Sequence, residues 1–190
     1  KQHKAAAYLL DTQLPDGGWN LYHGGSSHLS TTVKAYFALK LCGHSSEEPF
    51  MRRAREVILE QGGLTQANVF TRFALALFGQ FDWHDVPAMP IELFLLPKHS
   101  FFNMHEISYW SRTVLTPLMI IFAHKPVTPV PAGVDLMELR GEPRPKHADW
   151  FPGDSRLFSK RNLFLAADRL LHLYEWRPIQ FLLQAAMERA

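Results

Sequence analysis

Histidine and cysteine side chains can bind metals and act as nucleophiles. The chain has ten histidines and one cysteine, Cys42. No histidines have the His-Glu-x-x-His spacing and no Cys/His zinc pattern occurs, the nearest pair being His99 and His105. Cys42 lies in an apolar helical pattern and has no evident base partner. We therefore predict neither a metal site nor a catalytic thiol.

Arg72 is a candidate site residue of a different kind. It lies in a stretch, residues 66–79, whose apolar side chains would surround a helix on nearly every side. An unpaired charge inside such a helix would be very costly to bury. Arg72 must therefore be paired or must reach a polar cavity.

The stretch Gln13-Leu-Pro-Asp-Gly-Gly-Trp19 predicts a turn that ends one helix and orients the next. Pro15 cannot continue a helix, and Gly17 and Gly18 tolerate the left-handed backbone region. Trp19 is placed beyond the turn, where it can fold back on the end of the preceding helix. We read Gln13, Gly17 and Trp19 as structural residues.

Composition limits the class of protein. The chain has 190 residues, 47% of them hydrophobic and 13% aromatic, which is enough for a sizeable core. Its net charge of +2 and the lack of a basic stripe argue against a nucleic-acid partner. One cysteine cannot form a disulfide within the chain and favours a reducing compartment. The N-terminus lacks the apolar core of a signal peptide, and no apolar run is long enough for a transmembrane helix.

Helical periodicity predicts the elements that position these residues. Ser30 is the expected N-cap of the second helix, and Asn103 with Glu106 resembles a capping box before a helix kinked at Pro117. No β-type alternation occurs, so the pattern predicts an all-α fold of helical hairpins, as a solenoid or closed into an α/α barrel. The expected helices span residues 2–13, 30–43, 49–61, 66–79, 104–123, 155–175 and 178–190.

Three blocks of sequence carry a resemblance to a known family. The spacing Gln-x-x-x-Gly-x-Trp at residues 13–19 is the QW motif of triterpene cyclases, and Thr31-Thr-Val-Lys-Ala-Tyr-Phe-Ala-Leu-Lys40 follows it. The second block is Asn68-Val-Phe-Thr-Arg-Phe-Ala-Leu-Ala-Leu-Phe-Gly79, and the third is Ser108-Tyr-Trp-Ser-Arg-Thr-Val114. In order and spacing these blocks resemble the bacterial squalene–hopene cyclases.

The resemblance implies a fold and a reaction. Cyclases of this family contain two α/α barrels (toroids), and residues 1–190 would be a single all-α region, an incomplete part of the barrel without the acid motif. Their acid, an Asp of an Asp-x-Asp-Asp motif, protonates squalene and starts a carbocation polycyclisation to hopene or hopanol in hopanoid biosynthesis. Aromatic faces stabilise the cations, and no cofactor or metal is needed.

The resemblance also assigns site residues. Trp110 matches a tryptophan that lines the cyclisation cavity, and Arg72 matches an arginine of a polar network beside it. Ile107 and Leu115 match positions near the apolar entrance channel. Many relatives place a Glu on the helix before Arg72 as its partner, where this chain has Lys34. The QW residues would tie helix ends together, which is a supporting role.

The catalytic acid itself is missing from this sequence. No Asp-x-Asp-Asp and no Asp-Asp-x-x-Asp occurs, since Asp82-Trp-His-Asp85 has the wrong spacing. We therefore expect these 190 residues alone to be inactive, as part of a longer enzyme. Two alternatives remain: a non-catalytic helical-repeat module that binds a lipid or protein, and a related cyclase acting on another polyprene.

The expected partners follow from the family. They are squalene or a similar polyprene and, through the full-length protein, the cytoplasmic face of the bacterial inner membrane as a peripheral, monotopic protein; a homodimer is left open. Residues 91–96 and 117–122 could reach a membrane, although core packing is the favoured use. If the chain is a fragment, we expect exposed apolar surface and self-association at its last helices, at Phe164, Leu171, Phe181 and Leu182.

Overall fold

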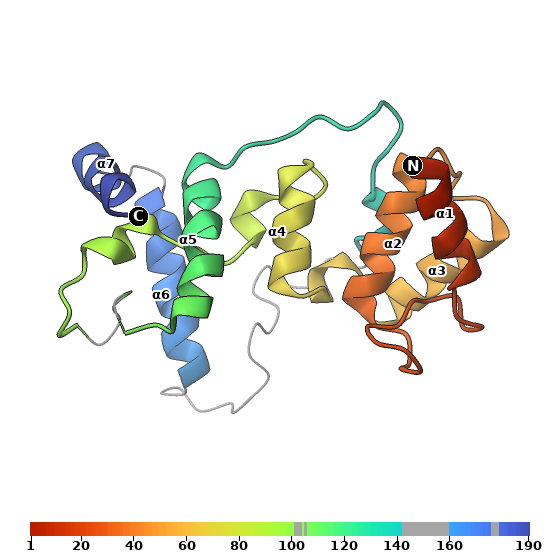
Figure 1. Ribbon diagram of the computed structural model, residues 1–190, viewed down its shortest axis with the longest axis horizontal. Coiled ribbons are helices and arrows are strands. Elements are labelled where there is room, and N and C mark those ends of the chain that lie inside the picture. The colour runs from red at the N-terminus through yellow and green to blue at the C-terminus, as the bar shows by residue number, and fades with distance from the viewer. Residues whose placement is uncertain (101–103, 105, 142–159, 176–178) are drawn as a thin grey trace. The chain divides into compact units, whose positions relative to one another are not determined.

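The computed structural model describes residues 1–100, 104, 106–141, 160–175 and 179–190, with side chains left undescribed at 160–165 and 175. Helices dominate these residues, which contain no β-strand and only one isolated bridge, between Asn20 and Ser27 (Figure 1). The predicted all-α class is therefore confirmed. Contacts divide the chain into two compact units: unit 1 is Lys1–Val86 with Val127–Ala148, and unit 2 is Pro87–Pro126 with Asp149–Ala190.

The described residues of unit 1 form four α-helices and three short 3-10 turns. Helix α2 packs against α1, α3 and α4, so it is the centre of this unit. The α-helices are α1 (Gln2–Asp11), α2 (Leu29–Leu41), α3 (Pro49–Glu60) and α4 (Val69–Leu77), and the 3-10 turns are η1 (Leu64–Gln66), η2 (Trp83–Asp85) and η4 (Met137–Leu139).

Helix α3 has the form that its sequence predicts. Pro49 occupies the first turn, where its missing N–H and fixed φ are tolerated, and Glu48 is the N-cap. The predicted apolar face is buried, while Arg52 and Arg53 remain exposed. The buried residues of this face are Met51, Ala54, Val57 and Ile58.

Three details of the predicted helices are wrong. Ser30 is not an N-cap: His28 holds that position, and the buried Ser30 hydroxyl accepts the Asn68 N–H at 2.8 Å instead. The predicted helix 66–79 is shorter, because the Asn68 side chain caps α4 by accepting the Thr71 N–H. That helix is also not covered all round, since Phe70 is 60% exposed.

Unit 2 contains η3 (Ile91–Leu95), α5 (Tyr109–His124), α6 (Lys160–Glu175) and α7 (Gln180–Arg189). Helix α5 begins at Tyr109 rather than at the predicted Met104, because Ser108 caps it by accepting the Ser111 N–H at 3.3 Å. The proposed capping residue Asn103 lies outside the described residues. Pro117 is inside α5, as predicted.

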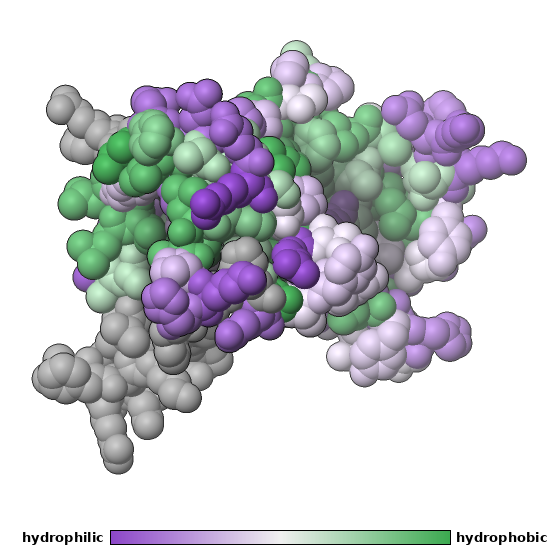
Figure 2. Space-filling view, turned by 60° about the vertical axis from the view of Figure 1, so that its left-hand side comes forward, coloured by the Kyte–Doolittle hydropathy of each residue, from purple (hydrophilic) through white to green (hydrophobic). Residues whose placement is uncertain are grey.

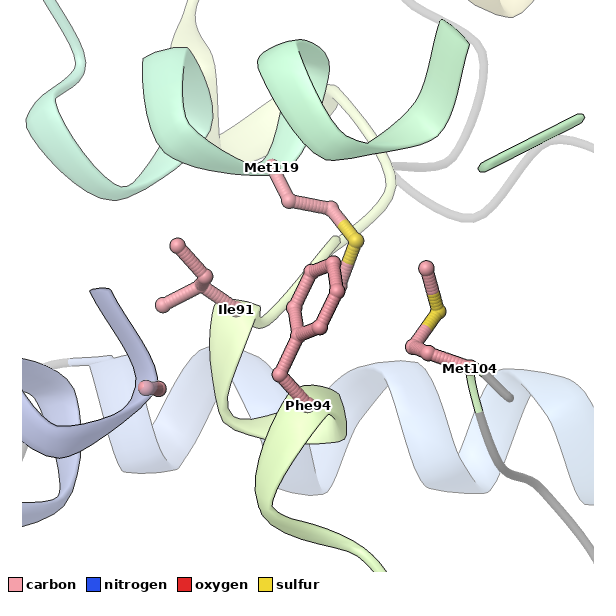
Figure 3. Packing of buried hydrophobic residues seen from close by; sticks show 5 residues of the cluster. Ile91, Phe94, Met104 and Met119 are labelled. Atoms are coloured by element: carbon pink, nitrogen blue, oxygen red, sulfur yellow. The ribbon is translucent and has the colours of Figure 1, made fainter. Parts of the chain in front are cut away.

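The core of unit 2 is a small cluster around η3. Ile91 and Phe94 of η3 pack together with Met104, with Met119 of α5 and with Ala186 of α7. Figure 3 shows the Phe94 ring beside the two methionine side chains. Segments 91–96 and 117–122 thus contribute Ile91, Phe94 and Met119 to this core, which agrees with the favoured use of those segments. Among the described residues, no helix is both long enough and apolar enough to cross a bilayer.

Candidate functional site

The predicted site residues are divided between the two units. Arg72 and the three QW residues belong to unit 1, whereas Trp110, Ile107 and Leu115 belong to unit 2.

The three QW residues come together at the junction of three helices. The Gln13 side-chain amide donates to the carbonyl oxygens of Gly17, at 2.8 Å, and Phe50, at 2.9 Å, which connects the turn after α1 with the start of α3. Gly17 has a φ of +98°, and a Cβ added there would lie 2.6 Å from the Cβ of Arg53. Only glycine can adopt this backbone so close to α3.

Trp19 connects the same turn with α1 and α2. Its indole N–H donates to the carbonyl of Leu9 in α1 at 2.8 Å, and its backbone N–H donates to the Thr32 hydroxyl in α2 at 3.0 Å. The residue is only 4% exposed. A buried aromatic ring with its N–H satisfied is the arrangement expected of a structural tryptophan.

Arg72 is buried in α4 with 8% of its surface exposed. Burial lowers its pKa to about 10, and the negative charge of Asp85 in η2 opposes that change. Beside it, Phe73 packs edge-to-face on Trp83 of η2, with ring centroids 5.2 Å apart. The Asp82 side chain caps η2 by accepting the His84 N–H at 2.9 Å. Asp82 therefore stabilises this turn, whereas Asp85 supplies negative charge near Arg72.

Lys34, which stands where the resemblance expects a partner for Arg72, is exposed on α2. It lines a groove of about 830 Å³ between α1, α2 and the loop after Trp19, together with Tyr8 and Tyr22. The sequence did not predict this groove, because its lining residues come from three elements without a common motif.

Trp110 lies in the first turn of α5 with 77% of its surface exposed, next to the equally exposed Tyr109. Ile107 and Leu115 are half-buried and pack against the cluster around η3. A pocket of about 270 Å³ opens along α5, lined by Tyr109, Arg112, Thr113 and Thr116 together with Phe94, Met104, Arg189 and Ala190. Within unit 2, the predicted residues thus form one exposed aromatic position and two aliphatic positions beside the core.

A polar cluster in unit 1 was missed by the sequence reasoning. Lys40 is buried on α2 and pairs with Glu138 of η4. The signal was present in the spacing: Lys40 follows the buried Tyr36 by four residues and so shares its face of the helix. A lysine on an apolar helix face predicts a buried partner.

The described residues contain no group of three or more potential metal-ligating side chains. His99 is exposed, and His105 lies outside the described residues.

Residues 1–190 match the family model described as squalene–hopene cyclase N-terminal domain. The squalene–hopene cyclase of Bradyrhizobium diazoefficiens is 51% identical over 136 residues, which are 72% of this chain and 21% of that protein. The squalene–hopene cyclase of Alicyclobacillus acidocaldarius is 36% identical over the whole chain, covering 29% of that protein. The dammaradiene synthase of Dryopteris crassirhizoma is 33% identical over 172 residues, which are 90% of this chain and 25% of that protein. The chain thus spans less than a third of the length of these relatives.

Proposed function

This chain belongs to the squalene–hopene cyclase family, as its N-terminal domain, and from that premise we propose that the protein carrying it cyclises squalene or a similar polyprene. The reaction would be a proton-initiated carbocation cyclisation to hopene or hopanol. The match over all 190 residues is the observation that carries this proposal.

The chemistry that this chain can supply is stabilisation of positive charge. The face of an indole ring carries negative electrostatic potential, which attracts a nearby cation, most strongly where water is excluded. Trp110 is the candidate for this role, because its ring is exposed at the start of α5 and is not buried in the core of unit 2. Ile107 and Leu115 would add apolar surface that neither reacts with a cation nor binds water.

Arg72 would take part from unit 1 as a fixed positive charge in a polar network beside the cavity. Its burial and the nearby charge of Asp85 support an arginine held in place by its surroundings. Gln13, Gly17 and Trp19 would act only through the integrity of the fold, since their hydrogen bonds are made within unit 1.

We expect the initiating proton to come from a part of the protein outside these 190 residues, because they contain no Asp-x-Asp-Asp motif. We therefore expect the isolated chain to form no cyclic product from squalene. Detectable hopene from the isolated chain would show that a different acid starts the reaction.

The central experiment compares Trp110→Ala and Trp110→Phe in the full-length protein, with squalene as substrate. Loss of one cation–π contact, of about 0.5–2 kcal/mol, should lower turnover by roughly 2–30-fold and change the product ratio, with Phe retaining more activity than Ala. Tyr22→Ala is the matched control, since Tyr22 is an equally exposed aromatic residue in unit 1. If Trp110→Ala gives the same products at the same rate, Trp110 does not line the cyclisation cavity. If the protein cyclises another polyprene but not squalene, the proposed substrate is wrong while the proposed mechanism stands.

Peripheral binding to the cytoplasmic face of the bacterial inner membrane is the second part of the proposal. Large apolar side chains are exposed on α6, α7 and the residue before α7, and Figure 2 shows hydrophobic surface over this part of the molecule. Flotation of the full-length protein with anionic vesicles tests it: Leu173→Glu with Phe181→Glu should reduce binding if these side chains enter the bilayer. If flotation is unchanged but the double variant no longer forms a dimer, these side chains instead contact a second copy of the protein. The exposed side chains are Leu170, Leu173, Ile179 and Phe181.

A further inference from the structure

The groove between α1, α2 and the loop after Trp19 has a volume of about 830 Å³ and no role in the proposed reaction. All of the described residues that line it belong to unit 1. Protein interiors are close-packed and contain few voids larger than a water molecule. A hollow of this size on a folded unit is therefore a surface against which something else packs.

Helix α1, which forms one wall of the groove, is covered less than the other α-helices of unit 1. Ala6 is the one buried residue of its ten, and Ala5 and Ala7 are exposed. Tyr8, which lines the groove, is 67% exposed. A helix of this length is marginal in water by itself, because most helical stability in proteins comes from packing of an apolar face. Helix α1 therefore lacks a packing partner on its groove side.

Helix α2 forms the opposite wall of the groove. Its lining residues recur at intervals of three and four positions, so they lie on one face of the helix. Two of them are alanines, and small side chains let a neighbouring helix approach closely, since the distance between helix axes depends on the side chains at the contact. This wall therefore has the form of a helix-packing face. The lining residues of α2 are Thr31, Lys34, Ala35 and Ala38.

Lys34 sets the charge that the partner must have. Its ammonium group makes no hydrogen bond or ion pair with any described residue. The described lining residues include no aspartate or glutamate, so nothing among them compensates this charge. A partner that fills the groove would cover Lys34, and burying an unpaired charge is very costly. The partner must therefore carry a carboxylate.

The length of the relatives indicates where the partner comes from. The chain spans less than a third of the two squalene–hopene cyclases compared with it, so most of a protein of this family lies outside these residues. A second copy bound through the same groove about a two-fold axis would instead bring two such lysines together without a carboxylate. A helix of the same polypeptide meets both requirements, apolar cover for α1 and a negative charge for Lys34.

We propose that an α-helix of the same polypeptide, from outside residues 1–190, packs along α1 and α2 in this groove and pairs an aspartate or glutamate with Lys34. Tyr8 and Ala38 contact the apolar face of that helix. Tyr22 belongs to the rim of the groove, since a Cβ added at Gly25 in its own loop would lie 3.0 Å from its ring. The proposal rests on membership of the family and not on the proposed reaction, so a full-length protein without cyclase activity would leave it standing.

Photo-crosslinking in the full-length protein identifies the occupant of the groove. On irradiation, a benzophenone amino acid in place of Tyr8 should bond to a helix of the same polypeptide outside residues 1–190. Mass spectrometry of the digest should find an aspartate or glutamate in that helix. An isotope-labelled second copy reveals bonds between copies, and added anionic vesicles reveal bonds to lipid. A bond to a second copy, to lipid or to another part of residues 1–190 would overturn the proposal, as would no bond at all.

Phe70 is the matched control position for the crosslink. It is 60% exposed on α4 and is not among the residues that line the groove. The same benzophenone amino acid in place of Phe70 should capture a different segment or none. Capture of the same helix from both positions would overturn the proposal, because the occupant would then not be confined to the groove.

Charge reversal tests the ion pair. In the full-length protein, Lys34→Glu should lower the melting temperature by about 2–4 °C, because two carboxylates would then face each other in a covered site. Lys4→Glu makes the same change at an exposed position of α1 outside the groove, and it should shift the melting temperature by less than about 1 °C. Equal shifts would overturn the pairing. If Lys34→Glu does not fold, Lys34→Gln should give the same result at smaller size.

The carboxylate in the captured helix allows a rescue experiment. Replacing that carboxylate by lysine in the Lys34→Glu variant restores a pair of opposite charges and should recover about half or more of the lost melting temperature. The same replacement in the wild type should lower the melting temperature, because two ammonium groups would then face each other. Absence of recovery in the double variant would show that the carboxylate does not face Lys34 and would overturn the proposal.

Discussion

Units 1 and 2 are built from similar apolar helices but differ in what fixes those helices. In unit 1, polar side chains bind helix ends to one another: Gln13 and Trp19 join the first three helices, and Lys40 binds Glu138 of η4. In unit 2, polar contacts also join elements, from the Tyr174 hydroxyl to Glu92 and from the Ala88 N–H to Asp168, but the described core is a small cluster containing two methionines. Large apolar side chains remain exposed on α6 and α7. The units therefore differ in how completely their apolar helix faces are covered.

The largest expected difference between the units is in the loss of stability when a tryptophan is replaced by alanine. Trp19→Ala should lower the free energy of unfolding of unit 1 by about 3–5 kcal/mol, because it empties a buried site. Trp110→Ala should change stability by no more than about 0.5 kcal/mol, since the ring is exposed. Urea denaturation followed by circular dichroism measures both. Equal losses would mean that Trp110 is packed as tightly as Trp19, and the contrast between the units would fail.

Two glycines of unit 1 test how tightly the turn after α1 packs against α3. Gly17 and Gly43 have φ of +98° and +93°, but a Cβ would meet Arg53 at Gly17 and nothing within 4 Å at Gly43. Gly43→Ala should cost about 1–2 kcal/mol for the left-handed backbone alone. Gly17→Ala should cost roughly 1–3 kcal/mol more, because α3 must shift. Equal melting temperatures in the two variants would show that the turn and α3 can separate freely.

A smaller effect should appear at alkaline pH. Because the pKa of Tyr36 is raised in the folded state, its contribution to stability is complete below pH 10 and is lost as the pH rises further. Relative to Tyr36→Phe, the wild type should therefore lose about 1 kcal/mol between pH 9 and pH 11. Tyr174→Phe in unit 2 is the comparison: the Tyr174 hydroxyl donates to Glu92 at 2.9 Å, with a pKa that is also raised but a more exposed ring, so the loss should be smaller. Parallel curves for wild type and Tyr36→Phe would contradict the burial of the phenol.

The smallest effect on stability should come from the exposed apolar side chains of unit 2. Phe181→Ser should change the free energy of unfolding by no more than about 0.5 kcal/mol, because Phe181 is 77% exposed. It should nevertheless reduce self-association of the isolated 190-residue chain, since it removes part of an apolar patch. Light scattering at several concentrations measures this, with Tyr22→Ser in unit 1 as the control. Greater loss of association with Tyr22→Ser would place the contact in unit 1.

The sequence predicts correctly those features that depend only on neighbouring residues within one helix or turn. The apolar face of α3, the proline at its start and the Gly17 turn follow from local periodicity and backbone sterics. The exposed face at the end of the chain was only partly located. Phe181 is exposed, but Leu171 and Leu182 are half-buried, and Leu170 and Leu173 are exposed instead; the Phe164 side chain lies outside the described residues.

The failures share one physical cause, which is a partner distant in the sequence. Ser30 has the chemistry of an N-cap, yet its hydroxyl accepts the N–H of Asn68, the N-cap of another helix. Lys40 has the chemistry of a solvated lysine, yet Glu138 buries it. Trp110 itself remains a prediction, since its assignment to a cavity depends on a surface beyond the unit that contains it.

The hydrogen bonds from Lys40 and Tyr36 to Glu138 span 98 and 102 residues of sequence. Unit 1 is interrupted in the sequence, and residues 87–126 of unit 2 are made by the ribosome before residues 127–140 of unit 1. Helices α1 to α4 can form early from local contacts, but Lys40 has no ion-pair partner until Glu138 has been synthesised. Closing a long loop costs only slightly more entropy than closing a shorter one, so this order of synthesis delays the contact without weakening it at equilibrium. Until then, the apolar surface against which Leu136 and Leu139 are buried in the folded chain has no cover from them.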